Sequence, residues 1–268
     1  MNQQYYHRLP KANGIQHVPN HGCALLDFHK LNLYAGQSYS GELAPDREAL
    51  LVMLSGKARV VVKESEFSSI GGRTNVFAGN PHSLYIPRGS NYEIHALSDI
   101  EAALPSAPSS LDIAPYEIKP EQVNTGTWGK LNFTRYFREI LVAPNGLPAS
   151  SLIVGETITP SGNWSTYPPH KHELVQGSEV FHEEIYYFRV SSPDGFGLCR
   201  HYSPERGYDT THTVRDDSFI SLPHGYHTYA AAPGAQSYYL WFLAGDARVQ
   251  GVSFDPETAW VQKATVLL

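Results

Sequence analysis

The chain has 268 residues with 17% charged and 12% aromatic side chains, and its formal net charge is −6. This composition is typical of a globular protein, and the lack of a basic block excludes an extended nucleic-acid surface. Two cysteines, Cys23 and Cys199, are too few for a disulfide framework. No run reaches the roughly 20 apolar residues of a membrane span, and the N-terminus has no signal-peptide pattern. We therefore expect a cytoplasmic protein with neither a membrane nor a nucleic-acid partner.

The first half of the chain predicts short β-strands punctuated by Gly and Pro. Residues 49–62 (ALLVMLSGKARVVV) give an apolar run, a Ser-Gly turn and a second run rich in valine. Residues 83–97 (SLYIPRGSNYEIHAL) have strand character on both sides of a Pro-Arg-Gly turn. Residues 97–126 are rich in Pro, Ser and Ala, which is typical of a linker region. The prediction is an N-terminal domain over 1–110 and a linker over 111–130.

The remaining residues, 131–268, predict a second domain of the same kind. Asn132–Leu141 (NFTRYFREIL) is the best helix candidate of the chain, although its pattern fits a strand equally well. Further runs have strand character, namely SSLIVGETITPSG (150–162), EEIYYFRV (183–190), FGLCRHYS (196–203), DSFISLPHGYHTYAAAPG (217–234) and SYYLWFLAG (237–245). Many short strands with frequent turn signals indicate an all-β chain of two sandwich or barrel domains.

The two halves share a short internal repeat. Pro223–His227 (PHGYH) matches Pro87–Asn91 (PRGSN), so the second copy of this motif ends in His and the first in Asn. Glu184–Phe188 (EIYYF) matches Glu48–Val52 (EALLV), but only the second copy has a His-x-His motif upstream. The pattern indicates a duplicated β-domain in which only the second copy keeps a polar cluster. We expect the N-terminal half to carry no chemistry.

That polar cluster has the composition of a metal site. Residues two apart on a strand point to the same side, so His170 and His172 share a face. Glu184 opens the next predicted strand, and His227 completes the set if its strand lies beside these. Three imidazoles and a carboxylate suit a divalent metal, with zinc or manganese favoured and iron, cobalt or nickel also acceptable.

Each part of this pattern also has an ordinary explanation. A His-x-His pair occurs on solvated strands, a Glu-Glu pair is commonly a solvated strand edge, and seven of the 13 histidines fall between 170 and 227. Glu173, Glu179 and Glu183 are alternative carboxylates, but only Glu184 directly precedes the strand on the inferred inward side. Order and strand parity together favour His170, His172, Glu184 and His227.

The motifs PPHKHE, EEIYYF and LPHGYH resemble the cupins, small β-barrels that hold a metal by His-x-His, a Glu and a later His. The spacing departs from the general cupin pattern, because eleven residues separate His172 from Glu184. With EEIYYFRV, GFGLCRHYS, GYHTYAAAPG and YYLWFLAG, the chain is similar to the 5-deoxy-glucuronate isomerases of myo-inositol catabolism, which are related to the 4-deoxy-5-keto-uronate isomerases. The resemblance spans nearly the whole chain and implies a bicupin.

The resemblance implies an aldose–ketose isomerisation of 5-deoxy-D-glucuronate to 5-dehydro-2-deoxy-D-gluconate. A bound metal would polarise the carbonyl, and either a base moves a proton between adjacent carbons or a hydride shifts directly. Candidates for the base are Glu183, His224, Tyr186 and Tyr229. Arg200 is the expected partner of the substrate carboxylate, because a guanidinium binds carboxylate with two parallel hydrogen bonds. Lys171 is expected to point away from the metal.

Two other functions use the same ligand set. A metal-dependent cupin dioxygenase would hold iron with three His and one Glu, and a non-catalytic bicupin would bind a sugar acid without turnover. A storage or structural bicupin would gain more from apolar residues in place of the ligands. The expected partner is a small sugar acid, and a homo-oligomer is compatible with the sequence.

Overall fold

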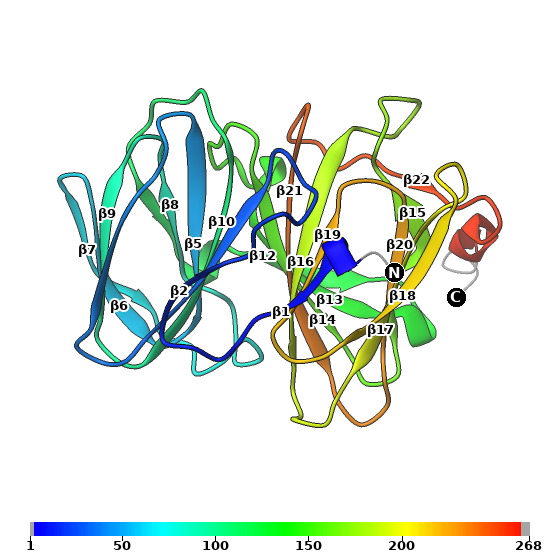
Figure 1. Cartoon of the computed structure of the whole chain (residues 1–268), viewed down its shortest axis with the longest axis horizontal. Coiled ribbons are helices and arrows are strands. Elements are labelled where there is room, and N and C mark those ends of the chain that lie inside the picture. The colour runs from blue at the N-terminus through cyan, green and yellow to red at the C-terminus, as the bar shows by residue number, and fades with distance from the viewer. Residues whose placement is uncertain (1–2, 264–268) are drawn as a thin grey trace.

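The alternation of short apolar runs with Gly and Pro turns produces strands that close into two β-barrels lying side by side (Figure 1). The computed structural model describes residues 3–263. Its helices are short 3-10 segments, namely η1 (Gln3–Tyr5), η2 (Pro120–Gln122), η3 (Leu131–Phe133), η4 (Ala143–Asn145) and η5 (Ala259–Lys263). Within the described residues, no helix has the length and apolarity needed to cross a bilayer.

The first barrel is built from two sheets of antiparallel strands. In spatial order, the six-stranded sheet contains β11 (Tyr116–Ile118), β8 (Ser83–Ile86), β5 (Arg47–Ser55), β10 (Ile100–Pro108), β3 (Asp27–Leu33) and β2 (Gly14–His17). The four-stranded sheet contains β4 (Ser38–Glu42), β9 (Asn91–Ala96), β6 (Lys57–Val62) and β7 (Ser65–Gly71). Fully buried aliphatic side chains such as Leu51, Val60 and Ile94 fill the space between the two sheets, so this barrel is a packed core.

The second barrel has the same plan with a more aromatic interior. Its seven-stranded sheet contains β1 (Tyr6–Arg8), β19 (Ser218–Leu222), β16 (His182–Val190), β21 (Ser237–Gly245), β14 (Ile153–Thr159), β13 (Arg135–Leu141) and β12 (Asn124–Trp128). Its five-stranded sheet contains β18 (Tyr208–Val214), β17 (Gly197–Ser203), β20 (Tyr226–Ala231), β15 (Trp164–Lys171) and β22 (Ser253–Phe254). Tyr186, Phe188, Tyr229 and Tyr239 pack between the sheets.

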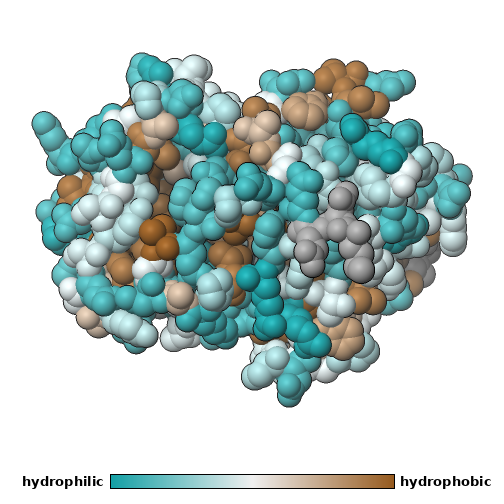
Figure 2. Space-filling view, in the orientation of Figure 1, coloured by the Kyte–Doolittle hydropathy of each residue, from teal (hydrophilic) through white to brown (hydrophobic). Residues whose placement is uncertain are grey.

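A third apolar cluster joins the two barrels through their larger sheets. Phe28 of β3 stacks on Tyr187 and Phe242 of the second barrel, with ring centroids 5.4 and 5.6 Å away. Beside it, Nζ of Lys30 lies 2.6 Å from Oδ1 of Asp217, and both side chains are buried. The apolar side chains therefore gather inside and between the barrels, and the face shown in Figure 2 is mostly hydrophilic with scattered apolar spots.

The topology confirms the internal repeat and corrects its register. The order β8-β5-β10-β3-β2 in the first barrel corresponds to β19-β16-β21-β14-β13 in the second. Ala49 pairs with Ile86, and Glu184 pairs with Leu222, each partner being the residue before a repeated Pro-x-Gly motif. The counterpart of Glu184 is therefore Ala49, and the predicted match of Glu184 to Glu48 was wrong by one residue. An alanine at this position explains further why the first barrel lacks the ligand set.

Half of the linker-like segment 97–126 is strand, and the predicted linker 111–130 contains two strands. Of residues 97–126, β10 lies inside the six-stranded sheet of the first barrel and β11 at its edge, while β12 begins the second barrel. The connection between barrels is thus reduced to the few residues around η2. The predicted domain over 1–110 also loses β1, which pairs with β19 of the second barrel. Residues 1–2 and 264–268, at the outer ends of the two predicted domains, lie outside the described residues.

Two local predictions are resolved by the sheets. The helix candidate Asn132–Leu141 forms strand β13 after a short 3-10 turn. The runs around the Ser-Gly turn at 55–56 form strands β5 and β6, but they belong to different sheets. Gly56 turns the chain between the sheets with φ of +78°, where a Cβ atom would lie 2.1 Å from the carbonyl oxygen of Asp99. Only glycine fits both requirements.

Candidate active site

The second barrel brings together the four predicted metal ligands. His170 lies on β15, His172 follows the end of that strand, Glu184 lies on β16 and His227 on β20. His170 is paired with His227 across β15 and β20, whereas β16 belongs to the facing sheet. The segment from the His-x-His motif to the Glu strand is therefore not one hairpin. It crosses the barrel, so that the ligands converge from both walls.

The geometry of this cluster suits a divalent metal. The four ligand atoms all lie within 4.8 Å of one another, and Nε2 of His172 is 3.0 Å and Nε2 of His227 is 3.2 Å from Oε2 of Glu184. Nδ1 of His172 is 2.7 Å from the carbonyl oxygen of His182. A proton on this nitrogen donates to that carbonyl, which leaves the lone pair of Nε2 facing the cluster, the usual arrangement of a metal-binding histidine.

His227 supplies an independent test of this fit. Its side chain is fully buried, and Nε2 faces Oε2 of Glu184 at 3.2 Å without the geometry of a hydrogen bond. A buried polar atom without a partner costs about 1–3 kcal/mol. A cation between the imidazoles and the Glu184 carboxylate would satisfy Nε2 of His227, so the residues present fit such an ion.

The electrostatics favour the ligating protonation state at His170, His227 and Glu184, whereas at His172 the hydrogen bond to Glu184 outweighs burial and raises the pKa. Burial, reinforced by the other imidazoles, lowers the pKa of His170 well below its usual value, and burial also lowers the pKa of His227. Burial alone would raise the pKa of Glu184, but its contacts with His172 and His227 hold the pKa of this carboxyl well below its usual range. Neutral imidazole and ionised carboxylate are the forms that bind metals.

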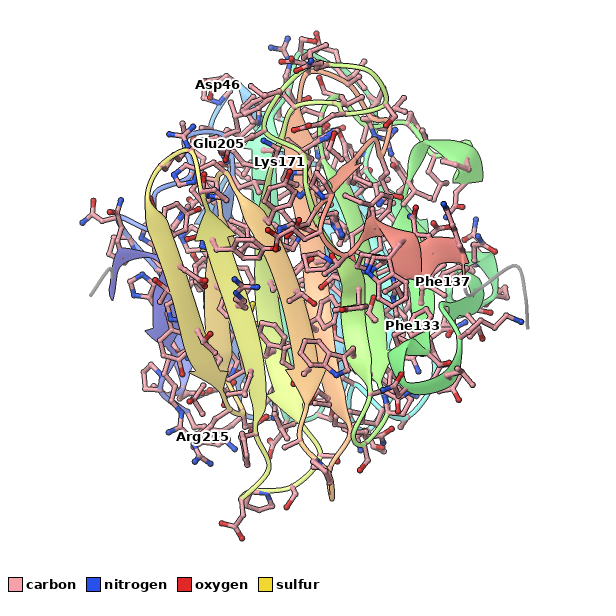
Figure 3. All side chains as sticks on the ribbon, turned by 90° about the vertical axis from the view of Figure 1, so that its right-hand side faces the viewer. Asp46, Phe133, Phe137, Lys171, Glu205 and Arg215 are labelled. Carbon is pink, nitrogen blue, oxygen red and sulfur yellow. The ribbon has the colours of Figure 1, made fainter. Side chains whose placement is uncertain are left out.

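The cluster lies at the wall of a cavity of about 640 Å³ in the second barrel. This volume lies within the range of small-molecule binding sites. Figure 3 shows Phe133, one of the lining residues, beside the five-stranded sheet. Much of the lining is aromatic and comes from several strands and loops: Trp128, Phe133, Tyr167, Tyr186, Tyr239, Trp241 and Phe254. These apolar walls can exclude water from whatever binds beside the four ligands.

Arg135 is a candidate site residue that sequence reasoning missed. It opens strand β13, lines the cavity and lies over the ring of Trp128, with Cζ 5.6 Å from the ring centroid. Its Nε is buried without a hydrogen-bond partner, and burial lowers the pKa of the guanidinium. The positive charge of Arg135 helps to lower the pKa of His170. The sequence pattern around Arg135 fits a helix or a strand, and only the closed sheet turns this side chain inward.

Arg200, the predicted partner of the substrate carboxylate, lies on the outside of the barrel. Along β17 the side chains of Cys199 and His201 are buried, so the intervening Arg200 points to solvent. Its guanidinium binds Asp209 through two hydrogen bonds of 2.9 and 2.6 Å and stacks on Tyr202. The strand alternation corrects this assignment, because Arg200 is not among the residues that line the cavity.

Lys171 points away from the cluster, as its parity predicted. Its Nζ is 2.9 Å from Oε1 of Glu173 and 3.8 Å from Oε1 of Glu205. Figure 3 shows Lys171 and Glu205 near one end of the barrel. This ion pair also accounts for Glu173, one of the alternative carboxylates. Glu179, another alternative, accepts the backbone N–H groups of Glu173 and Leu174.

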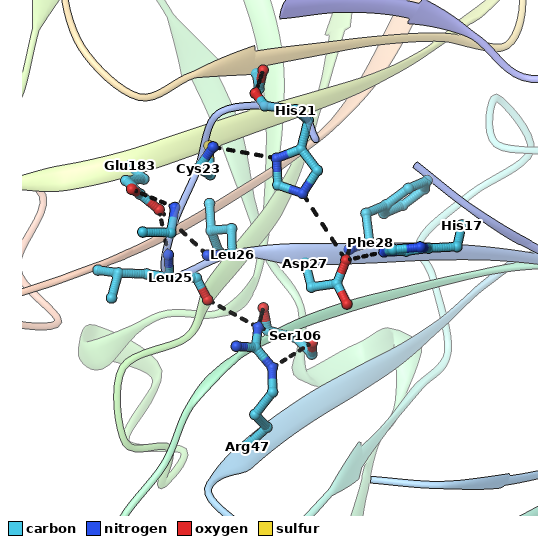
Figure 4. A network of polar contacts seen from close by, with 12 residues as sticks. His17, His21, Cys23, Leu25, Leu26, Asp27, Phe28, Arg47, Ser106 and Glu183 are labelled. Atoms are coloured by element: carbon cyan, nitrogen blue, oxygen red, sulfur yellow. Dashed lines mark hydrogen bonds and ion pairs between the residues drawn. The ribbon is translucent and has the colours of Figure 1, made fainter. Parts of the chain in front are cut away.

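Glu183 is not at the cavity, although it was a candidate base. Its carboxylate accepts the backbone N–H groups of Ala24 at 2.8 Å and Leu25 at 2.7 Å, in the segment that leads into the first barrel (Figure 4). It alternates with Glu184 on β16, so the two carboxylates face opposite sides of the sheet. The position of Glu183 corrects its predicted role, because its oxygens are occupied by these amides.

Of the other three candidate bases, only Tyr186 lines the cavity. His224 lies away from it, with Nδ1 2.9 Å from the hydroxyl of Tyr208 and Nε2 3.3 Å from that of Tyr5. Tyr229 is buried in the core and donates to Oγ of Ser237 at 2.6 Å. Burial, together with Glu184, raises the pKa of Tyr186 well above its usual value. Its hydroxyl therefore stays protonated near neutral pH.

Comparisons with known proteins agree with the site and the fold. The model of the KduI/IolB family matches residues 4–261 of the chain. The 5-deoxy-glucuronate isomerase of Geobacillus thermodenitrificans (strain NG80-2) is 37% identical over 245 residues, which are 91% of this chain and 88% of that protein. The 5-deoxy-glucuronate isomerase of Bacillus subtilis (strain 168) is 36% identical over 258 residues, covering 93% and 94% of the two chains.

Solved structures extend this similarity to three dimensions. An IolB-like protein from Salmonella typhimurium LT2 has a TM-score of 0.91 with 32% identity, covering 96% of this chain and 99% of that one. An oxalate decarboxylase structure has a TM-score of 0.63 with 12% identity over 98% and 84% of the two chains, and shares the bicupin fold alone. The match over nearly the whole length, in sequence and in structure, establishes that this chain belongs to the KduI/IolB family.

Proposed function

We propose that this chain is an aldose–ketose isomerase that converts 5-deoxy-D-glucuronate to 5-dehydro-2-deoxy-D-gluconate in myo-inositol catabolism. The observation that carries the proposal is the His170–His172–Glu184–His227 cluster at the wall of the cavity in the second barrel. It stands in a chain whose full-length relatives carry the name 5-deoxy-glucuronate isomerase. A site for one small polar substrate beside a cation is what this reaction requires.

The four side chains would hold one divalent ion. Imidazole and carboxylate together accept zinc and manganese, which we favour, and also iron. When bound, such an ion polarises a carbonyl group and stabilises negative charge that develops on its oxygen. The chain positions the ligands by the His172–His182 hydrogen bond and by the strand pairing of His170 with His227.

Arg135 would bind the substrate carboxylate. The substrate is an open-chain sugar acid with its aldehyde and carboxylate at opposite ends, so a cation distinct from the metal must receive the carboxylate. Arg135 lines the same cavity, and its buried Nε lacks a partner. A guanidinium is well suited to this task, because it offers several N–H donors in a rigid plane. Trp128 would hold this plane in place through the stacking contact.

The reaction moves hydrogen without net oxidation. The hydrogen on the carbon that bears the hydroxyl moves to the neighbouring aldehyde carbon, and the hydroxyl proton moves to the former carbonyl oxygen. Glu184 is the single carboxylate that lines the cavity among the described residues, and a carboxylate held by a metal is a weak base. Tyr186 would serve as a proton donor at the oxygen, since its raised pKa keeps the hydroxyl protonated.

The chemistry of this reaction indicates the partner of the protein and its location in the cell. The partner is a small sugar acid, consistent with the cavity volume of about 640 Å³. A catabolic isomerase acting on a sugar acid is expected in the cytoplasm, and assembly into a homo-oligomer stays a prediction.

The test is direct conversion of 5-deoxy-glucuronate by the purified protein, followed by NMR in deuterated water, before and after chelation. We expect conversion that is lost on chelation and restored by a divalent metal. Deuterium on the receiving carbon would indicate proton transfer through solvent-exchangeable groups. Hydrogen retained there would indicate a hydride shift or a shielded proton. Metal-replete protein that leaves the substrate unchanged would contradict the proposal.

The same samples separate the alternative activities. Oxygen consumption by iron-loaded protein with the sugar acid would point to a dioxygenase. Binding of the sugar acid without turnover, unaffected by chelation, would point to a non-catalytic bicupin.

A further inference from the structure

The first barrel carries its own group of potential metal ligands, which the isomerase site does not use. His17, Asp27 and His29 each offer one ligand atom, and these atoms lie within 4.8 Å of one another. We propose that His17, Asp27 and His29 form a second divalent transition-metal site, which binds an ion such as zinc and fastens the edge of the first barrel. The proposal rests on residues outside the isomerase cavity and does not depend on the activity of that cavity.

Strand geometry puts the three side chains on one face of the sheet. Asp27 and His29 lie two residues apart on β3, so both point to the same side. His17 lies on the edge strand β2, directly opposite His29 in the antiparallel register. This combination of an i, i+2 pair and a cross-strand partner is also how the second barrel presents His170, His172 and His227. It gives two imidazole nitrogens and one carboxylate oxygen.

The distances are compatible with an ion once the side chains adjust locally. Nε2 of His17 is 2.8 Å from Oδ1 of Asp27, and the rings of His17 and His29 lie 4.6 Å apart. Ligand atoms at about 2.0–2.1 Å from a tetrahedral metal are about 3.3 Å apart. His17 and Asp27 would therefore separate by about half an ångström as the ion enters between them. The contacts in the isomerase cluster, 3.0 and 3.2 Å from Glu184, are of the same size.

The neighbouring residues hold the carboxylate in place. Oδ1 of Asp27 accepts the backbone N–H of Phe28 at 2.8 Å, and Nε2 of the buried His21 lies 4.0 Å from it. In Figure 4, His17 and His21 approach Asp27 from different directions. The nearest guanidinium in this network, that of Arg47, is bonded to Leu25 and Ser106. The amide of Phe28 thus fixes Oδ1 of Asp27 beside Nε2 of His17, where the ion would enter.

The donor set decides the class of ion. Two imidazoles with one carboxylate favour zinc, copper, nickel or cobalt over calcium or magnesium, which prefer oxygen ligands. The His17 side chain is 45% exposed, so the remaining positions would be filled by water. The consequence is structural, because the ion would tie the edge strand β2 to β3 near the segment that Glu183 holds. A three-ligand site at the surface is expected to bind more weakly than the buried four-ligand site.

The experiment measures metal stoichiometry on the full chain. Protein stripped with a chelator is dialysed against a zinc buffer, and zinc per chain is determined by atomic emission. We expect two zinc ions per chain for the natural sequence. His17→Ala and Asp27→Asn should each bind one and keep full isomerase activity, whereas His172→Ala should lose the other ion and the activity. His95→Ala is the matched control, since His95 lies in the same barrel and its side chain bonds to Ser38.

Thermal unfolding provides a second measurement that is independent of activity. In the His172→Ala background, added zinc should raise the unfolding midpoint, because an ion that binds only the folded state stabilises it. The rise should vanish in the His17→Ala, His172→Ala double variant. A single zinc ion per chain in the natural sequence, or a second ion that persists in His17→Ala and Asp27→Asn, would overturn the proposal. The latter result would mean an adventitious ion only.

Discussion

Glu48 of the first barrel and Glu183 of the second occupy equivalent positions, and each carboxylate crosses to the other barrel. Glu48 accepts the backbone N–H groups of Ser151 and Leu152, each at 2.8 Å, just before the second barrel's strand β14. Glu183 accepts those of Ala24 and Leu25 just before the first barrel's strand β3. The two barrels therefore hold each other by a reciprocal pair of contacts. The carboxylate of Glu183 therefore joins the two barrels, in place of the predicted role as catalytic base.

Replacing Glu183 should cost stability and spare catalysis. Glu183→Gln weakens charge-assisted bonds to backbone amides, which are worth about 1.5–3 kcal/mol each when the acceptor is ionised. We expect the free energy of unfolding in urea to fall by about 1–3 kcal/mol. Glu48→Gln, the matched variant, should lose a similar amount. A Glu183→Gln protein of unchanged stability but greatly reduced kcat would restore Glu183 as the base.

Removing a ligand should abolish both metal binding and turnover. His172→Ala deletes the imidazole that the His182 carbonyl orients toward Glu184. Kinetics with 5-deoxy-glucuronate should show kcat/KM lower by at least about 100-fold, together with loss of tightly bound metal. His212→Ala, which changes a histidine on β18 away from the cavity, should leave both unchanged. Full activity in a metal-free His172→Ala protein would remove this cluster from the mechanism.

The choice between the two arginines can be made with a pair of variants. Arg135→Ala should lower kcat/KM about 10- to 100-fold, because a hydrogen bond to a charged group contributes about 1.5–3 kcal/mol. Arg135→Lys should recover only part of this loss, since a lysine lacks the planar fork. Arg200→Ala should have wild-type kinetics, because Arg200 is bonded to Asp209 on the outer surface. The reverse result would restore Arg200 as the carboxylate binder.

Stability should fall in acid through the buried His201. Burial lowers the pKa of His201 from 6.5 to about 3. Below pH 6.5, His201 therefore binds a proton in the unfolded chain but stays neutral in the folded chain. Stability is therefore complete above the unfolded pKa and is lost as the pH falls toward the folded one. Between about pH 7 and 4.5 this histidine should contribute a loss of about 2–3 kcal/mol.

The measurement for this prediction is urea unfolding of the natural protein and of His201→Gln at both pH values. The variant cannot take up the proton in either state, so its pH-dependent loss should be smaller by about the same 2–3 kcal/mol. The difference between the two proteins isolates His201 from the other titrating groups. Equal losses in both would show that the folded protein accommodates the charged imidazole.

The sequence by itself determined the class of fold and the four-residue cluster. Both depend on local rules. Apolar runs broken by Gly and Pro indicate strands, and side chains two residues apart on a strand share a face, as His170 and His172 do. The repeated Pro-x-Gly motif also located His227 in the second copy. Such patterns can be recognised in the sequence because they depend only on residues that are close together in the chain.

Only the tertiary structure decided which other residues meet that cluster. Arg135 reaches the cavity and Arg200 does not, because the closing of the barrel fixes which face of each strand is interior. Glu183 lies next to Glu184 in sequence, yet its partners are at residues 24–26, more than a hundred positions earlier. Strand β1 likewise belongs to the N-terminal half of the sequence but pairs with β19 of the second barrel. These contacts arise from how the sheets pack, and no local pattern encodes that packing.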